Sequence, residues 1–284
     1  MKILLVYPYY PTTFWSFRNA MKFIDRKASF PPLGLMTVAA MLPESWDKRL
    51  VDMNVRSLED DDLLWADYVF ISAMTIQRPS VREVLERCRR LEVKTVAGGP
   101  LFTSCHEDFP EVDHLVLGEA EMTLPLFLKD LRRGMPRRLY VAEGWAPLDE
   151  TPAPLWDLVA MKDYAAMNIQ YGRGCPFDCE FCDITALFGR KPRSKPLDRI
   201  LAELQTLYVW GWKGAVFKTM LFLGVLGKER FHYWKLFFWS LFRKPRLFPL
   251  AITYAVYGFH FRKVAEKIKG CGMFDGNEGW DAGV

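Results

Sequence analysis

Hydrophobic and polar positions alternate along the first half of the chain in a pattern that predicts strands and helices in turn. Short apolar runs suit buried parallel strands, whereas apolar residues spaced three or four apart suit helices packed on a sheet. Strands are expected at 3–7, 49–53, 68–73, 94–97 and 114–117. Helices are expected at 32–42, at 121–131 and after Ser80-Val-Arg-Glu83, which reads as a capping box. This order predicts an α/β fold built on a doubly wound parallel sheet.

The pattern changes after about residue 144 and predicts further units. Residues 145–157 carry three prolines among polar residues, which is typical of a linker. Beyond it we expect a strand at 167–171, a helix at 196–210 that stops at Gly211, and a second strand at 214–217. The expected division is a first domain at 1–144, a linker at 145–166, the start of a second core at 167–218 and a helical C-terminal segment at 219–284.

Composition narrows the class of protein. With 284 residues, 50% of them hydrophobic, the chain is long enough for two domains with their own cores, which argues against a largely disordered chain. Three of the six cysteines fall within eight residues, a pattern that suits metal binding in a reducing compartment better than a disulfide framework. The first apolar run is short and meets Pro8, so it predicts a buried strand rather than a signal peptide. We therefore expect a cytoplasmic protein.

Positive charge and aromatic residues are concentrated near the C-terminus. Residues 228–269 hold ten Lys or Arg against two acids, and residues 231–261 hold twelve aromatic residues. No stretch there reaches the ~20 apolar residues that span a bilayer. For this segment we favour a packed helical cap. The second interpretation is contact with a membrane surface, which would make the protein peripheral to the membrane. We expect no nucleic acid partner.

Three cysteines in one short loop are the candidate metal ligands. They occur in the run Gly172-Arg-Gly-Cys175-Pro-Phe-Asp-Cys179-Glu-Phe-Cys182. Thiolates are soft ligands that suit iron in clusters, and three of them leave one iron of a 4Fe-4S cluster open to another ligand. Structural zinc is an alternative, but it needs four ligands and the four histidines are distant in sequence. Three buried structural cysteines are the other alternative, and the C-x3-C-x2-C spacing favours the cluster.

This loop resembles the motif of the radical S-adenosylmethionine superfamily, which it matches at Cys175, Cys179, Phe181 and Cys182. The resemblance implies that S-adenosylmethionine binds the open iron and that backbone near Phe181 contacts its adenine. It implies an electron donor such as flavodoxin or ferredoxin, because an electron from the cluster cleaves the cofactor to a 5'-deoxyadenosyl radical. That radical takes hydrogen from an unactivated carbon, so the cofactors carry the difficult chemistry.

Three strand ends in the first domain offer candidate ligand contacts, since doubly wound sheets bind ligands beyond the carboxyl ends of their strands. The segments are Ser72-Ala-Met74-Thr75, Gly98-Gly99 and Gly118-Glu119-Ala-Glu121. Hydroxyl groups suit polar contacts, and paired glycines leave room for a ligand near the backbone. Each segment also suits an ordinary turn or a helix N-terminus, where acids are favoured by the helix dipole.

The first domain resembles the cobalamin-binding domain that precedes many radical S-adenosylmethionine cores. The resemblance assigns the nucleotide tail of cobalamin to Ser72 through Met74 and to Gly98 with Gly99. Thr75, Gly118 and Glu119 are further candidate cofactor contacts. The Asp-x-His-x-x-Gly element of classical cobalamin proteins is absent, because the loop after the first strand reads Pro8-Tyr-Tyr-Pro11. This departure implies that no histidine binds the cobalt from below.

The C-terminal segment resembles the extension found in a subgroup of cobalamin-dependent radical methylases that includes hopanoid C-2 methylases. The resemblance covers about 1–217 and 226–269, and most of the family's six-stranded partial barrel is missing between these blocks. We expect an iron-sulfur enzyme that methylates carbon in a small-molecule or lipid-like substrate. The alternative is a shortened, non-catalytic module that binds cobalamin and a cluster. The sequence assigns no catalytic residue.

Overall fold

The computed structural model describes residues 1–13, 16–17, 21, 24–141, 143–177, 179–180, 182–208 and 230–243. The chain forms two compact units. The first consists of Met1–Pro11 and Phe30–Gly211, and the second of Thr12–Ser29 and Trp212–Val284. The domain boundaries expected from the sequence remain predictions.

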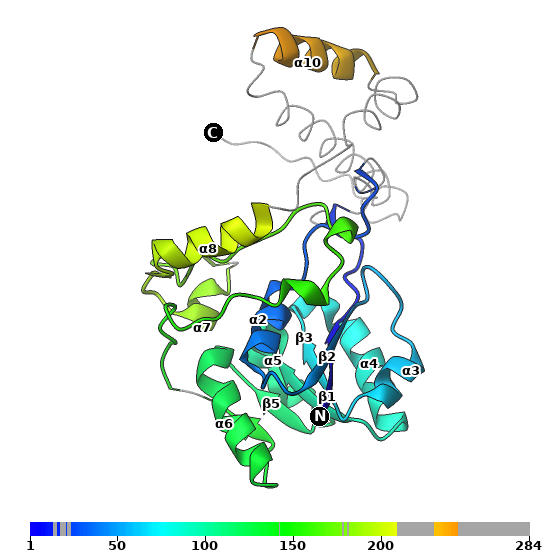
Figure 1. Ribbon diagram of the computed structural model, residues 1–284, viewed down its shortest axis with the longest axis vertical. Coiled ribbons are helices and arrows are strands. Elements are labelled where there is room, and N and C mark those ends of the chain that lie inside the picture. Colours follow the sequence, from blue (N-terminus) through cyan, green and yellow to red (C-terminus); the bar gives the residue numbers. More distant parts are fainter. Residues whose placement is uncertain are drawn as a thin grey trace, which may run out of the picture. The chain divides into compact units, whose positions relative to one another are not determined.

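A six-stranded sheet forms the centre of the first unit, in the order β2-β1-β3-β4-β5-β6 (Figure 1). The strands are β1 (Lys2–Tyr7), β2 (Asp47–Asp52), β3 (Tyr68–Ser72), β4 (Lys94–Gly98), β5 (His114–Val116) and β6 (Leu139–Tyr140). Every pairing between neighbours is parallel. The chain runs from β1 to β2 on one side and returns to β3 on the other, so the strand order reverses at β1. The predicted doubly wound parallel sheet is therefore confirmed, with β6 as an additional edge strand.

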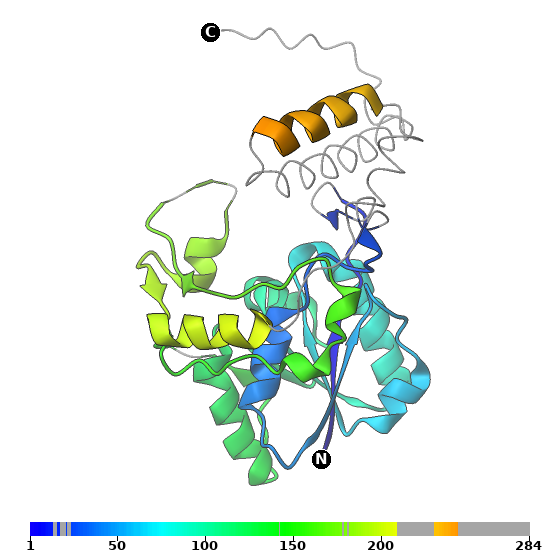
Figure 2. The same cartoon turned by 45° about the horizontal axis from the view of Figure 1, so that its top comes forward.

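Helices cover both faces of this sheet (Figure 2). They are α2 (Leu33–Met41), α3 (Asp60–Trp65), α4 (Arg78–Arg90), α5 (Pro100–Cys105) and α6 (Ala120–Arg132). The three longer helices were predicted, whereas α3 and α5 have six residues each, too few for a clear helical period.

The predicted capping box at Ser80 is wrong. Helix α4 begins two residues earlier, at Arg78, because Pro79 suits the first helical turn, where an N–H has no partner within the helix. Ser80 therefore lies inside the helix, and its hydroxyl accepts a hydrogen bond from Tyr9 N at 2.9 Å.

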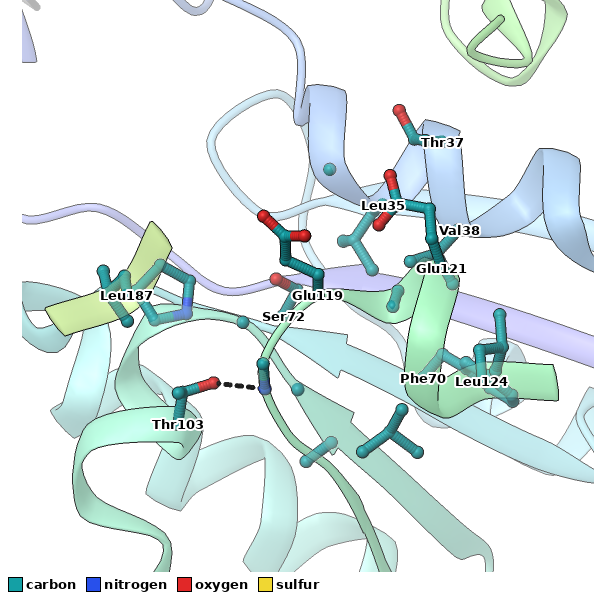
Figure 3. A pocket seen from close by; sticks show the side chains of 18 of the residues that line it. Leu35, Thr37, Val38, Phe70, Ser72, Thr103, Glu119, Glu121, Leu124 and Leu187 are labelled. Carbon is teal, nitrogen blue, oxygen red and sulfur yellow. Dashed lines mark hydrogen bonds between the residues drawn. The ribbon is translucent and has the colours of Figure 1, made fainter. Parts of the chain in front are cut away.

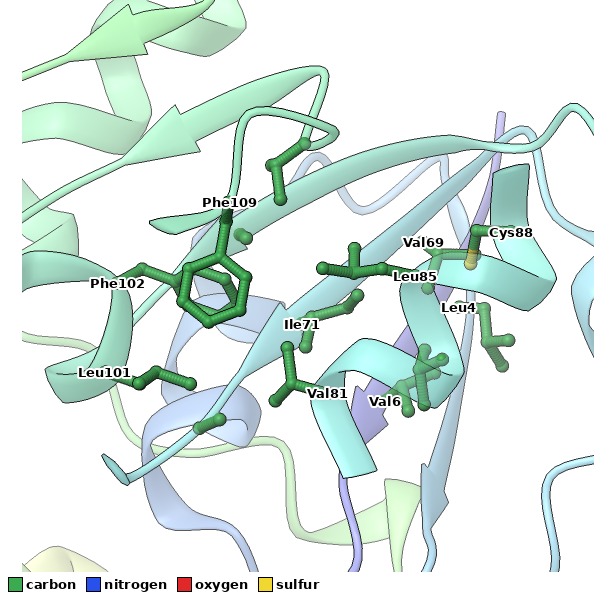
Figure 4. Packing of buried hydrophobic residues seen from close by; sticks show 14 of the residues in the cluster. Leu4, Val6, Val69, Ile71, Val81, Leu85, Cys88, Leu101, Phe102 and Phe109 are labelled. Carbon is green, nitrogen blue, oxygen red and sulfur yellow. The ribbon is translucent and has the colours of Figure 1, made fainter. Parts of the chain in front are cut away.

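Alternating apolar side chains along each strand build a core on each face of the sheet. On β1, Leu4 and Val6 point to the face covered by α3, α4 and α5, and Ile3 and Leu5 to the face covered by α2 and α6. Figure 4 shows the first of these clusters, in which α4 packs its apolar side chains against β1 and β3. All four β1 side chains are fully buried, as expected for a parallel strand covered on both sides.

The stretch predicted as a linker packs against the first unit. Ala146, Leu148 and Trp156 are buried, and Leu155 N donates a hydrogen bond to Met36 O in α2 at 3.2 Å. Apolar residues beside the prolines thus anchor this segment to the sheet domain.

The region of the cysteine loop has a different architecture from the predicted strands. Two short antiparallel strands, β7 (Gly172–Arg173) and β8 (Arg193–Ser194), frame the helix α7 (Ile184–Phe188). The strand predicted at 167–171 is not formed. After β8 comes α8 (Leu197–Tyr208), and Lys195 donates a buried hydrogen bond to Glu203 of α8 at 2.5 Å. Gly211 and the strand predicted at 214–217 lie outside the described residues.

The second unit contains α10 (Arg230–Arg243), which confirms a helical C-terminal region. Aromatic rings stack along this helix, with centroids of Trp234 and Phe238 5.4 Å apart and those of Phe238 and Phe242 6.1 Å apart. Among the described helices, none combines the length and apolar character that crossing a membrane requires. The other predicted aromatic and basic residues, from 244 onwards, lie outside the described part.

Candidate functional site

A pocket of about 270 Å³ opens at the carboxyl edge of the sheet, on the face covered by α2 and α6. Its apolar wall is formed by residues of α2, β3, β4, β5 and α6, namely Leu35, Val38, Phe70, Val96, Val116 and Leu124. Polar residues also line it, namely Thr37, Ser72, Thr103, Glu119 and Glu121 (Figure 3). An apolar cavity with a few placed polar groups is typical of a site for a small molecule or cofactor.

Most of the candidate contacts predicted in the first domain line this pocket. They are Ser72, Gly98, Gly99, Gly118 and Glu119. Met74 and Thr75 are exposed and do not line it. Met74 N donates to the Gln77 side chain at 2.8 Å, and Gln77 donates to Pro8 O at 2.6 Å, so the turn after β3 is tied to the loop after β1.

The Gly98-Gly99 pair is required by the packing of the protein itself. A Cβ at Gly98 would lie 2.6 Å from Val116 O on the neighbouring strand. Gly99 has a φ of +84°, and a Cβ there would collide with the Ser72 hydroxyl. The space that a side chain at either glycine would take is therefore filled by β3 and β5, and the pair shapes the pocket by letting three strand ends approach each other.

Open space lies instead beside Gly34 and Gly118. No atom lies within 4 Å of the position that a Cβ would take at either residue, and both line the pocket. Gly118 has a φ of +77°, and its N–H donates to Thr103 Oγ1 at 3.0 Å (Figure 3). Gly34 was not among the predicted residues, because a glycine near the start of a helical pattern is tolerated at a modest cost and does not by itself indicate a site.

Two carboxylates at the start of α6 are bound by two arginines from the cysteine region. Glu121 accepts from both terminal nitrogens of Arg173, at 3.0 and 2.7 Å, and from the Thr151 hydroxyl at 2.8 Å. Glu119 accepts from both terminal nitrogens of Arg193, at 3.0 and 2.6 Å, and from Ala146 N at 2.6 Å. Glu119 therefore lines the pocket with its carboxylate already bonded within the protein.

Burial and charge oppose each other at the first of these pairs. Burial favours the neutral form of Glu121, but hydrogen bonds and charge from Arg173 outweigh it, and the pKa of Glu121 is lowered. Burial also disfavours the charged form of Arg173, but Glu121 and Glu119 outweigh it, and the pKa of Arg173 is raised. Both side chains are therefore charged at neutral pH.

The cysteine loop is accessible, but it does not form a metal centre among the described residues. Cys175 and Cys182 are partly exposed and Cys179 is exposed, and Cys182 N donates to Cys179 O at 3.0 Å. No group of three His, Cys, Asp or Glu residues in the described ranges is arranged to hold a metal ion. Convergence of the three thiols therefore stays a prediction. Phe181, predicted to lie near adenine, falls outside the described residues.

A buried carboxylate lies at the carboxyl end of β2. Asp52 accepts hydrogen bonds from Asn54 N at 2.9 Å, from Asn54 Nδ2 at 2.7 Å and from the Tyr164 hydroxyl at 3.1 Å. Burial raises the pKa of Asp52, while these hydrogen bonds oppose the shift. Burial and the Asp52 charge also raise the pKa of the Tyr164 hydroxyl. This polar cluster joins the sheet to the segment that leads to the cysteine loop.

Comparisons with known proteins match two parts of the chain to family models. Residues 23–128 match the B12 binding domain, and residues 190–271 match a domain of unknown function, DUF4070. The cysteine loop lies between the two matched ranges.

Several curated proteins resemble the chain over most of its length. An uncharacterised methyltransferase of Synechocystis is 42% identical over 76% of this chain and 41% of its own. A hopanoid C-2 methylase of Rhodopseudomonas palustris is 36% identical over 76% of this chain and 42% of its own. An uncharacterised methyltransferase of Pyrococcus horikoshii is 31% identical over 81% of this chain and 55% of its own. The matched part thus spans about half or less of the length of these relatives.

Proposed function

This chain is a B12-binding-domain protein, and from that premise we propose that its pocket receives the nucleotide tail of cobalamin. The tail ends in a flat, largely apolar heteroaromatic base. The apolar wall of Phe70, Val96 and Leu124 suits such a base, and the rim hydroxyls of Ser72 and Thr103 suit its polar linkage. The location supports the same assignment, because ligands of doubly wound sheets bind at this edge.

That no histidine binds the cobalt from below stays a proposal, which rests on the loop after β1, where the sequence reads Pro8-Tyr-Tyr-Pro11. Gly34 and Gly118, which have open space beside them, leave room for the cofactor.

The pocket assignment is tested by filling the space beside Gly34. Gly34→Leu is expected to weaken binding of hydroxocobalamin by about 1–3 kcal/mol, the usual cost of overpacking a site. Ala40→Leu, on the same helix but outside the pocket lining, is the matched control. Cobinamide, which lacks the nucleotide base, is expected to bind weakly to the parent and to be insensitive to Gly34→Leu. Equal binding of cobalamin and cobinamide, unchanged by the substitution, would contradict the assignment.

For the whole protein we propose methyl transfer to carbon by a radical S-adenosylmethionine reaction on a lipid-like substrate. The support is similarity to relatives named as methyltransferases, one of them a hopanoid C-2 methylase. In such a reaction bound cobalamin supplies a methyl group, and an iron-sulfur cluster with S-adenosylmethionine supplies the radical. An electron donor such as flavodoxin or ferredoxin is part of this proposal. The chain's own share is to hold the cofactors close together and to exclude water.

The donor set of the cysteine loop suits a cluster. Cys175, Cys179 and Cys182 are free thiols with at least partial access to solvent, on a loop that begins directly after β7. Anaerobic reconstitution with iron and sulfide is expected to load the parent chain, and Cys175→Ala is expected to lose most of the iron. Cys105→Ala, at a partly exposed thiol outside this loop, is the matched control. Equal iron in parent and Cys175→Ala would refute the cluster.

Catalysis and simple binding are separated by one product. Protein that carries a full cluster is incubated with S-adenosylmethionine and dithionite, and 5'-deoxyadenosine is measured. Its formation supports the radical enzyme. Its absence in fully loaded protein favours the alternative, a cobalamin- and cluster-binding module that does not catalyse.

A further inference from the structure

Two arginine–glutamate pairs connect the pocket domain to the hairpin that carries the cysteines. Arg173 lies on β7, two residues before Cys175, and Arg193 lies on β8. Their partners, Glu121 and Glu119, lie at the start of α6 in the sheet domain. Both strands of the hairpin are thus attached to one helix end at the pocket.

These pairs are buried and bidentate. The side chains of Glu119 and Glu121 are 1% and 9% exposed, and those of Arg173 and Arg193 are 9% and 17% exposed. Arg173 also lies 3.5 Å from Glu119, so the two pairs form one connected group of charges. A planar guanidinium that donates two parallel hydrogen bonds to a carboxylate fixes orientation as well as distance.

Neutral groups of the hairpin region complete this group. Arg193 donates to Ala146 O at 2.6 Å and to Phe188 O at 3.1 Å, and Arg173 donates to the Gln170 side chain at 2.8 Å. Buried ion pairs often add little net stability, because desolvation offsets their attraction. Their specific effect here is to fix where the hairpin lies against the sheet domain.

The hairpin region supplies part of the wall of the pocket. Gln170, Arg173, Leu187 and Phe188 line the pocket together with the sheet residues. Figure 3 shows Leu187 of α7 near the Ser72 and Glu119 side of the site. A ligand in the pocket therefore contacts the sheet domain and the hairpin at the same time, and it gains the second set of contacts only while the pairs hold the hairpin in place.

We propose that the pairs Arg173–Glu121 and Arg193–Glu119 couple the pocket to the cysteine loop, so that filling the pocket orders the loop. The inference rests on the proposed cobalamin site and adds a positioning role for four residues that contact each other. Because binding energies are linked, a hairpin that is held in place strengthens ligand binding, and a bound ligand holds the hairpin by the same factor. The coupling thus favours an ordered cysteine loop when the neighbouring cofactor is present.

The test measures hydrogen exchange of the full chain with and without hydroxocobalamin. In the parent, the ligand is expected to slow exchange of peptides within 172–195 as well as those of the pocket. Arg193→Gln, at a residue outside the pocket lining, is expected to lose the slowing at 172–195 and to bind cobalamin roughly fivefold to 150-fold more weakly, the range typical of coupled sites. Arg137→Gln, which breaks the exposed ion pair to Asp130 in the same unit, is the matched control and should change neither result.

The outcomes separate the coupling from the cofactor assignment. If the parent binds no cobalamin, the proposed function fails. If cobalamin binds and exchange at 172–195 does not change, the coupling is wrong while the cofactor site stands. If Arg193→Gln does not fold, the ligand-dependent exchange of the parent still decides the question.

Discussion

Asp52 shows how one buried side chain gives the fold a pH dependence. The residue is 3% exposed, and its carboxylate accepts hydrogen bonds from Asn54 and Tyr164. The sequence predicts that a strand ends near this aspartate. It does not predict the partnership with Tyr164, which lies 112 residues further along the chain, because only the tertiary fold brings the two together.

Asp52→Asn is expected to leave the protein equally stable or more stable at neutral pH. The folded-state pKa of Asp52 lies above its unfolded value, so ionisation opposes folding at high pH, and this cost is relieved as the pH falls through the folded pKa. The contribution of Asp52 to stability thus rises on acidification, and Asn removes that dependence while retaining an acceptor for Asn54. Urea unfolding of the parent and the variant at neutral and mildly acidic pH measures this pH dependence of stability.

Two further variants complete this experiment. Tyr164→Phe is expected to destabilise the protein by about 1–3 kcal/mol at neutral pH, because it removes a donor from a buried carboxylate. Asp47→Asn, at the exposed start of the same strand, is the control and should be near neutral. An Asp52→Asn variant that gains as much stability on acidification as the parent would contradict the assignment.

At the scale of elements, two glycines explain why β7 and β8 pair where they do. A Cβ at Gly172 would lie 2.6 Å from Arg193 O, and a Cβ at Gly174 would collide with Lys191 O. The alternating residues at 167–171 favour a strand locally, but a strand needs a partner in register. The backbone hydrogen bond from Lys195 N to Tyr171 O, at 2.8 Å, extends the hairpin only to the last of these residues.

Gly174→Ala is expected to reduce iron loading several-fold, because it strains the backbone next to Cys175 and pushes away Lys191, which lies just before β8. Gly134→Ala is the matched control. Gly134 also has a positive φ, +73°, but no atom lies near its Cβ position, so that variant carries the conformational strain of about 1–2 kcal/mol without the collision. Iron and sulfide analysis after anaerobic reconstitution compares the two. Equal loading in both variants would show that the hairpin geometry does not matter to the cysteines.

At the scale of the whole molecule, the parallel sheet and its main helices were predictable, because period and turn signals are local. The pocket location was predictable in outline, since five candidate residues at strand ends line it. The packing role of Gly98 and Gly99 was not predictable, because their packing partners lie on other strands. The two arginines next to the cysteine motif were missed, because their glutamate partners lie 52 and 74 residues away along the chain.

The aromatic C-terminal helix predicts a test on the full chain. Phe231 and Phe242 of α10 are 78% and 76% exposed, on a helix that also carries Lys235 and Arg243. Aromatic and basic groups together suit an anionic lipid surface, so the protein is expected to float with anionic vesicles and less so in high salt. Phe242→Ser should reduce flotation, whereas Leu197→Ser, at an exposed apolar residue of the first unit, should not. A parent that stays with the soluble fraction would favour the helical cap instead.

The order of the pocket residues along the chain has a consequence for how the protein is made. The sheet wall comes from residues between Leu33 and Leu124, whereas the hairpin wall comes from residues between Gln170 and Phe188. A ribosome adds roughly 5–20 residues per second, so the residues of the sheet wall are made a few seconds before those of the hairpin wall. We expect a sheet that folds within this interval to leave the pocket open on the side of the hairpin, so that a bulky cofactor enters most easily then.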